Sequence, residues 1–173
     1  SFSRNALRFA SVTQLMRQPY DFSTGAVTVI YVARSRVATS GRILQAMNNN
    51  WALGWQGGME GVAHYEGWVQ SSAPASNTRP HVMSAVIRGS GQASDFAMDG
   101  VVKATGTGGV TGPNGLAING AGYYNEPTDS ELAEMIVFPR ALTTAERSTI
   151  ELGLMAKWGT AANATPSPKS ARV

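Results

Sequence analysis

The chain has 173 residues, of which 43% are hydrophobic and only 14% charged, with 19 glycines, 8 prolines and no cysteine. This length is sufficient for one domain with its own hydrophobic core, and the missing cysteines exclude a disulfide-stapled module and thiol chemistry. The net charge of +3 comes from basic residues scattered along the sequence, and no apolar run approaches the ~20 residues of a membrane span, so we expect neither nucleic-acid binding nor membrane insertion.

The first strong strand signal is Ala26–Ala33, a segment rich in β-branched residues. Both of its faces are largely apolar, so it is expected to be central and covered on both sides. The opposite sheet would cover one face, and a loop, a helix or a neighbouring subunit would cover the other. A homo-oligomer is compatible with this pattern.

Two hairpins are expected. The segments Arg42–Met47 and Trp51–Trp55 flank three asparagines, which tolerate the left-handed turn conformation. Trp51 and Trp55 alternate with small residues, which favours a core position for both rings. In the second hairpin, an Asp-Gly pair typical of type I′ turns separates two more strands. These strands and the remaining expected ones are Asp95–Met98, Val101–Ala104, Met59–Tyr65, His81–Arg88, Leu116–Asn119 and Glu131–Phe138. The glycine-rich stretch Thr105–Gly115 is expected to form no element.

One helix is expected near the C-terminal end of the chain. Thr143 and Glu146 have capping-box spacing, in which each side chain binds the other residue's backbone N–H. An apolar stripe follows at intervals of four residues, and Gly159 supplies a stop. The stripe consists of Ile150, Leu154 and Trp158.

These signals predict an all-β fold, an antiparallel sandwich of two sheets with one C-terminal amphipathic helix. A parallel α/β fold would need a helix between successive strands, and the sequence has none. We expect a single domain at residues 1–159. Residues 160–173, with two prolines and small polar residues, are expected to form a tail.

The order of these motifs resembles the laminin-G-like, concanavalin-A-like family in its bacterial and phage members, from about Ala6 to Gly159. The resemblance implies a jelly-roll β-sandwich that binds glycans or proteins, often with Ca²⁺ at a rim. The segments that carry it are Val27–Val32, Arg42-Ile43-Leu44, Pro80-His81-Val82, Met98-Asp99-Gly100, Leu116–Gly120, Leu132–Thr143 and the helix that ends at Gly159.

The resemblance favours a non-catalytic binding or structural module, namely a phage virion component such as a capsid-decorating, tail-fibre or receptor-binding protein. Its partners would be virion proteins or a cell-surface glycan. The alternative is a glycan-binding accessory domain of a larger bacterial secreted protein, and a glycoside hydrolase is less favoured still. The expected location is a virion, the extracellular space or the cell surface, although no signal-peptide pattern opens this chain.

The strongest argument for an enzyme is the acidic pattern at Asp129, Glu131 and Glu134. Some glucanases with this fold place three acids along one strand, and a retaining enzyme needs two carboxylates about 5 Å apart. Strict alternation would put Glu134 on the face opposite Glu131 unless a bulge intervenes. We therefore expect no catalytic residues.

Ligand binding is expected at aromatic residues in loops, where rings can stack on a sugar and amides can bind its hydroxyls. The same residues could be hot spots of a protein interface, or could pack under a loop. The candidates are Trp68, Tyr123, Tyr124 and Asn125.

No metal site or cofactor is expected. His64 and His81 are the only histidines, and two isolated histidines cannot hold zinc without carboxylate partners. For His81 we expect a core or rim position at the start of a strand. Hard oxygens near loop ends could serve Ca²⁺, but their spacing fits no calcium loop and does not place the ligands. They belong to Asp95, Asp99, Asn114 and Asp129.

Overall fold

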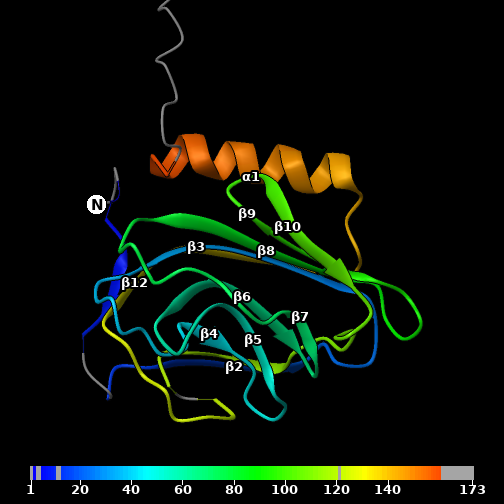
Figure 1. Ribbon diagram of the computed structural model, residues 1–173, viewed down its shortest axis with the longest axis horizontal. Coiled ribbons are helices and arrows are strands. Elements are labelled where there is room, and N and C mark those ends of the chain that lie inside the picture. The colour runs from blue at the N-terminus through cyan, green and yellow to red at the C-terminus, as the bar shows by residue number, and fades with distance from the viewer. Residues whose placement is uncertain (1, 3–4, 11–12, 121, 161–173) are drawn as a thin grey trace, which may run out of the picture.

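A computed structural model describes residues 2, 5–10, 13–120 and 122–160. Two six-stranded antiparallel sheets face each other, and one helix lies across the outside of the first sheet (Figure 1). This confirms the expected β-sandwich with a C-terminal helix. In spatial order the first sheet, sheet A, contains β1 (Leu7–Phe9), β12 (Ser130–Phe138), β3 (Val27–Ser35), β8 (His81–Ile87), β9 (Ser94–Met98) and β10 (Val101–Gly106).

The second sheet, sheet B, supplies the opposite wall of the sandwich. In spatial order it contains β2 (Met16–Asp21), β11 (Asn114–Ile118), β4 (Leu44–Gln45), β5 (Trp51–Gln56), β6 (Met59–Tyr65) and β7 (Trp68–Gln70). Side chains alternate between its inner and outer faces, so the residues that contact the core also fix which residues lie outside.

The main core lies between the sheets and is rich in aromatic rings. Trp51 and Trp55 are fully buried there, as the small-large alternation of β5 predicted. Trp51 stacks on Tyr65 with ring centroids 5.6 Å apart, and Trp55 meets Tyr31 edge-on at 6.2 Å. These contacts tie sheet B to sheet A through large apolar surfaces.

A second core lies between sheet A and helix α1 (Thr144–Trp158). Ile30 and Val32, on the outer face of β3, pack with Leu154 and Trp158 of the helix. The two apolar faces of β3 are therefore explained within one chain, because the helix covers the second face. The helix begins with the expected capping box, and Gly159 ends it in the left-handed conformation, with φ 66°.

The sequence missed three strands, and all three lie at sheet edges. These are β1, β2 and β7. An edge strand does not need apolar residues on both of its faces, and β2 is almost wholly exposed. It also contains Pro19, which an edge strand tolerates. Trp68, expected in a loop, opens β7.

The glycine-rich stretch at 105–115 was also wrongly taken to be outside all elements. Its first two residues end β10, and its last two begin β11. The hairpin before it is confirmed, because Asp99 and Gly100 both have positive φ, at 50° and 79°. Of the tail expected at 160–173, all but Thr160 falls outside the described residues. Within the described ranges, no helix is both long and apolar enough to cross a membrane.

Candidate functional site

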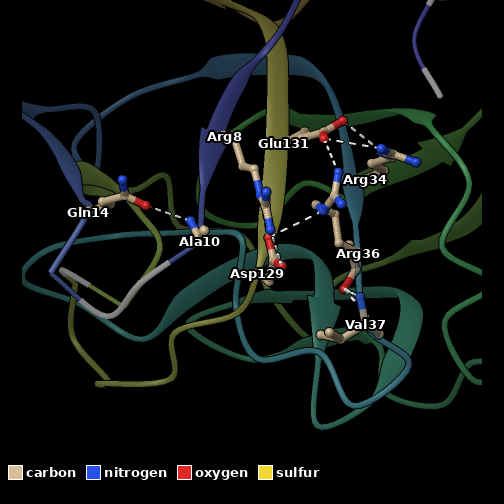
Figure 2. Close-up of polar contacts among 9 residues, drawn as sticks. Arg8, Ala10, Gln14, Arg34, Arg36, Val37, Asp129 and Glu131 are labelled. Atoms are coloured by element: carbon tan, nitrogen blue, oxygen red, sulfur yellow. Dashed lines mark hydrogen bonds and ion pairs between the residues drawn. The ribbon is translucent and has the colours of Figure 1, made fainter.

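The acidic pattern that suggested a hydrolase forms an ion network on sheet A. Figure 2 shows Arg8 and Arg36 around Asp129, and Arg34 and Arg36 around Glu131. Arg34 Nε donates to Glu131 Oε2 at 2.7 Å, and Arg36 Nη1 donates to Oε1 at 2.5 Å. The hydrogen bond from Arg34, more than the one from Arg36, lowers the pKa of Glu131 despite partial burial.

Glu134 lies on the same face as Glu131, because the register of β12 shifts between Leu132 and Glu134. The bulge that strict alternation ignores is therefore present. Glu134 accepts hydrogen bonds from Lys157 Nζ at 2.7 Å and from Trp158 Nε1 at 2.6 Å. The Lys157 bond, followed by the Trp158 bond, lowers the pKa of Glu134 against a desolvation effect. A general acid needs a raised pKa, so these two glutamates are poorly suited to that role.

A different charged cluster is buried between the two sheets. His81 donates from Nδ1 to Asp99 Oδ2 at 2.6 Å and from Nε2 to Glu60 Oε1 at 3.0 Å. The other oxygen of Glu60 accepts from Trp55 Nε1 and from Ser76 Oγ, both at 3.2 Å. Since carboxylates only accept, both imidazole nitrogens carry protons and the ring is a cation. We call these five residues the inter-sheet network.

The pKa of His81 reflects this environment. Burial opposes the charged form, but the hydrogen bonds to Asp99 and Glu60 outweigh it and raise the pKa to about 9. His81 does begin strand β8, as expected, yet its partners come from β6 and from the Asp-Gly turn. No spacing in the sequence could have revealed the cluster, because each member lies on a different segment.

A cavity of about 310 Å³ opens beside this network, between β6, β7 and the edge of sheet A. Glu60 forms part of its wall together with Met98 and Lys103. However, three protein groups already bind the Glu60 carboxylate, so little of its hydrogen-bonding capacity remains for a ligand.

The four residues considered for calcium do not converge. Asp95 binds Arg88, Asp99 binds His81, Asp129 binds Arg8, and Asn114 donates to Asp21 at 3.1 Å. Within the ranges that the structure covers, no group of three or more His, Asp or Glu side chains could hold a metal ion.

The expected ligand-binding residues, by contrast, lie on one surface. Strand register aligns a row of residues across four strands of sheet B, and directly paired residues share a face. Gln45 pairs with Ala52, Ala52 with His64, and His64 with Trp68. Their neighbours along the strands point into the core, so this row faces outward. Trp68 is 42% exposed, and its ring meets His64 edge-on at 4.7 Å.

The tyrosines reach the same outer face from the loop after β11. Both backbone groups of Tyr124 bind the side chain of Gln45: its carbonyl accepts from Nε2 at 2.7 Å, and its N–H donates to Oε1 at 3.1 Å. The backbone N–H of Tyr123 donates to the carbonyl of Ala46 at 2.9 Å. A Cβ at Gly122 would lie 2.3 Å from that carbonyl oxygen, so only glycine lets the loop approach β4 this closely.

A chain of polar contacts connects the two aromatic ends of this face. The Arg42 guanidinium lies 4.5 Å from the centre of the Tyr124 ring and donates to Asn50 Oδ1 at 3.0 Å. The backbone carbonyl of Asn50 lies 2.7 Å from His64 Nδ1. The backbone N–H of Asn50 donates to Glu66 Oε1 at 2.5 Å. We call the surface formed by Trp68, His64, Asn50, Arg42, Tyr123 and Tyr124 the aromatic face of sheet B.

The exposed rings and the buried polar support together make this face a platform. Tyr123 and Tyr124 are 51% and 41% exposed and contact each other edge-on at 4.9 Å. Asn125, also exposed, follows them in the loop. The sequence named the aromatic residues separately, but it missed Arg42, Asn50 and His64, whose roles depend on strand register.

Known proteins share the fold of this chain. No protein-family model and no curated protein matches it. Domain 4 of AbnA, a GH43 extracellular arabinanase from Geobacillus stearothermophilus solved in complex with arabinotriose, has a TM-score of 0.62 at 18% identity. That likeness covers 87% of this chain and 80% of that one.

Two further structures match this chain over less than half of their own length. Trypanosoma rangeli sialidase, solved in complex with the inhibitor DANA, gives a TM-score of 0.59 at 16% identity over 87% of this chain. This chain spans only 28% of the sialidase chain. The binding domain of botulinum neurotoxin serotype G gives a TM-score of 0.54 at 8% identity, and the match covers 89% of this chain and 48% of that one. The chain therefore shares the β-sandwich fold of these structures.

Proposed function

We propose that this chain is a non-catalytic glycan-binding module, and that the aromatic face of sheet B binds the glycan. The main support for this proposal is the register of β4 to β7. It places Trp68 on the same outer face as Gln45, the residue that anchors Tyr124. Aromatic rings offer flat apolar surfaces that stack on sugar rings, and exposed aromatics are typical anchors of binding surfaces.

The neighbouring folds support this proposal. Domain 4 of the arabinanase was solved with a trisaccharide, and the toxin structure is itself a binding domain. The pKa values of Glu131 and Glu134 are both lowered, so neither is suited to be the general acid that a glycoside hydrolase needs, which favours binding over hydrolysis. A direct check is incubation of the wild type and a Glu131→Gln variant with β-glucans. Hydrolysis that the substitution abolishes would contradict the non-catalytic proposal.

We also propose that the chain is a laminin-G-like domain, on the strength of its Met-Asp-Gly hairpin and of the last strand, which leads through Arg140-Ala141-Leu142-Thr143 into a capped helix. This resemblance favours a phage virion component, in capsid decoration or in a tail fibre. An accessory domain of a secreted bacterial protein would use the same face.

A glycan array with the wild type and with Trp68→Ala and Tyr124→Ala tests the proposed face. Both variants should lose binding by at least about tenfold, or ~1.4 kcal/mol, without loss of stability, because the rings are exposed. Tyr20→Ala is the matched control, since Tyr20 is 61% exposed on edge strand β2, outside the aromatic face. Equal losses in all three variants would place the site elsewhere, and a wild type that binds no glycan would overturn the proposal.

A further inference from the structure

We infer that the aromatic face takes a neutral, linear oligosaccharide of about three sugar residues and discriminates against acidic glycans; the inference rests on the proposed function. The first argument is the length of the face. Gln45, beneath the Tyr124 loop, and Trp68 are three strand spacings apart in sheet B, or about 14 Å. A sugar ring with its linkage is about as long as one strand spacing, so a ligand that contacts both ends needs about three residues.

The second argument is the charge of the face. Its cation, Arg42, has a side chain only 3% exposed, lies against the Tyr124 ring, and donates from Nε to Glu126 Oε2 at 3.0 Å. A buried and neutralised guanidinium offers little attraction to a ligand carboxylate. Glu66, in contrast, is exposed, and the backbone N–H of Asn50 binds only one of its two carboxylate oxygens, Oε1. A ligand anion would therefore meet a negative charge beside Asn50.

The third argument is the direction of the available hydrogen bonds. His64 Nδ1 faces the backbone carbonyl of Asn50, which only accepts, so the donor at Nδ1 is already satisfied. Glu66, in contrast, offers carboxylate oxygens, which accept from the hydroxyl donors of a neutral sugar.

One exposed cation, Arg17, occupies the same register row, where it pairs with Ala117 on β11. It lies two strands beyond Gln45, on the side away from Trp68. A ligand that spans Tyr124 and Trp68 therefore extends away from Arg17. This makes Arg17→Gln the matched control for a substitution at Glu66.

The test is calorimetric titration of the wild type with linear neutral oligosaccharides of one to six residues and with uronate-containing oligosaccharides of the same lengths. Both series should come from the glycan classes on the array that tests the proposed function. Affinity for neutral ligands should rise up to three residues and then change by less than about threefold, and acidic ligands of equal length should bind at least about tenfold more weakly.

The Glu66→Gln variant should reduce the difference in affinity between neutral and acidic ligands severalfold, and Arg17→Gln should leave this difference unchanged. Two results would overturn this inference while the glycan-binding function stands. Acidic ligands could bind as tightly as neutral ones, or a monosaccharide could bind as tightly as a trisaccharide. Absence of binding to every array glycan, neutral or acidic, would instead overturn the proposed function and this inference with it.

Discussion

The inter-sheet network and the aromatic face of sheet B are made of similar groups, but they differ in burial. The network is buried between the sheets, whereas the aromatic face keeps its rings exposed. Each combines aromatic rings with a cation that binds a carboxylate: His81 binds Glu60 in the network, and Arg42 of the face binds Glu126. In the network, Glu60 and His81 are almost completely buried, and their charged groups bind other protein groups. On the aromatic face, the polar groups hold one another below rings that stay 41–51% exposed. The first arrangement joins two sheets, whereas the second leaves apolar surface for a ligand.

This difference shows that buried charge is a poor guide to function in this fold. His81 has a strongly shifted pKa and lies near a cavity, two features often found in active sites. Its partners nevertheless come from both sheets and bind both of its nitrogens. Structural ion networks shift pKa values as well, so the raised pKa is explained without catalysis. The two regions should therefore respond differently to substitution.

The largest expected effect is on stability, at Glu60. A Glu60→Ala substitution leaves His81, Trp55 and Ser76 without their shared acceptor, and should lower the free energy of unfolding by about 4 kcal/mol, as measured by urea denaturation. Glu60→Gln, which keeps an acceptor oxygen but not the charge, should cost less. Glycan binding at a temperature where the variants stay folded should be unchanged. A loss below about 1 kcal/mol for the alanine variant would show that the network does not join the sheets.

The next effect is a pH dependence that belongs to the network alone. The folded pKa of His81, about 9, lies above the ordinary value of 6.5, so its stabilisation is complete below pH 6.5 and is lost as the pH rises through 9. The loss should approach about 3 kcal/mol in the free energy of unfolding between pH 6 and pH 10. The measurement is urea denaturation across this range for the wild type and for His81→Gln. Curves of the same shape for both proteins would contradict the assignment.

The smallest effect should be confined to the aromatic face. In Gly122→Ala, the new Cβ would collide with the carbonyl of Ala46, so the Tyr123–Tyr124 loop should move away from β4. Glycan affinity should fall by about tenfold, or ~1.4 kcal/mol, while the Trp68 end stays intact. Gly25→Ala is the control, because a Cβ there meets no atom within 4 Å. Unchanged affinity in Gly122→Ala would show that the tyrosines do not contact the ligand.

Local patterns predicted the central elements well. The two-faced composition of Ala26–Ala33, the small-large alternation around Trp51, the Asp99-Gly100 turn and the Thr143 capping box each appear in the structure as expected. Each of these signals is complete within about ten residues, so no distant partner is needed to interpret it. The edge strands were missed because exposed strands carry little apolar pattern.

The candidate site was only half predictable for the same reason. Trp68, Tyr123 and Tyr124 could be named from residue type and context, although their ligand role stays a prediction. Arg42 and His64 could not be named in this way. Arg42 belongs to the face because it contacts the Tyr124 ring, 82 positions away in the sequence. His64 belongs to it because strand pairing places it there. The bulge in β12, which brings Glu131 and Glu134 to one face, was likewise invisible in a strictly alternating pattern.

The sequence by itself therefore determined the type of fold: period-two apolar patterns, turn residues and a capped helix leave a sandwich as the way to bury two apolar faces of one strand. Tertiary structure alone decided that the helix covers the second face of β3, that His81 is shared between carboxylates of two segments, and that Trp68 and Tyr124 lie on one surface. The physical reason is that register and sheet order place residues far apart in the chain side by side, and no local propensity encodes those distances.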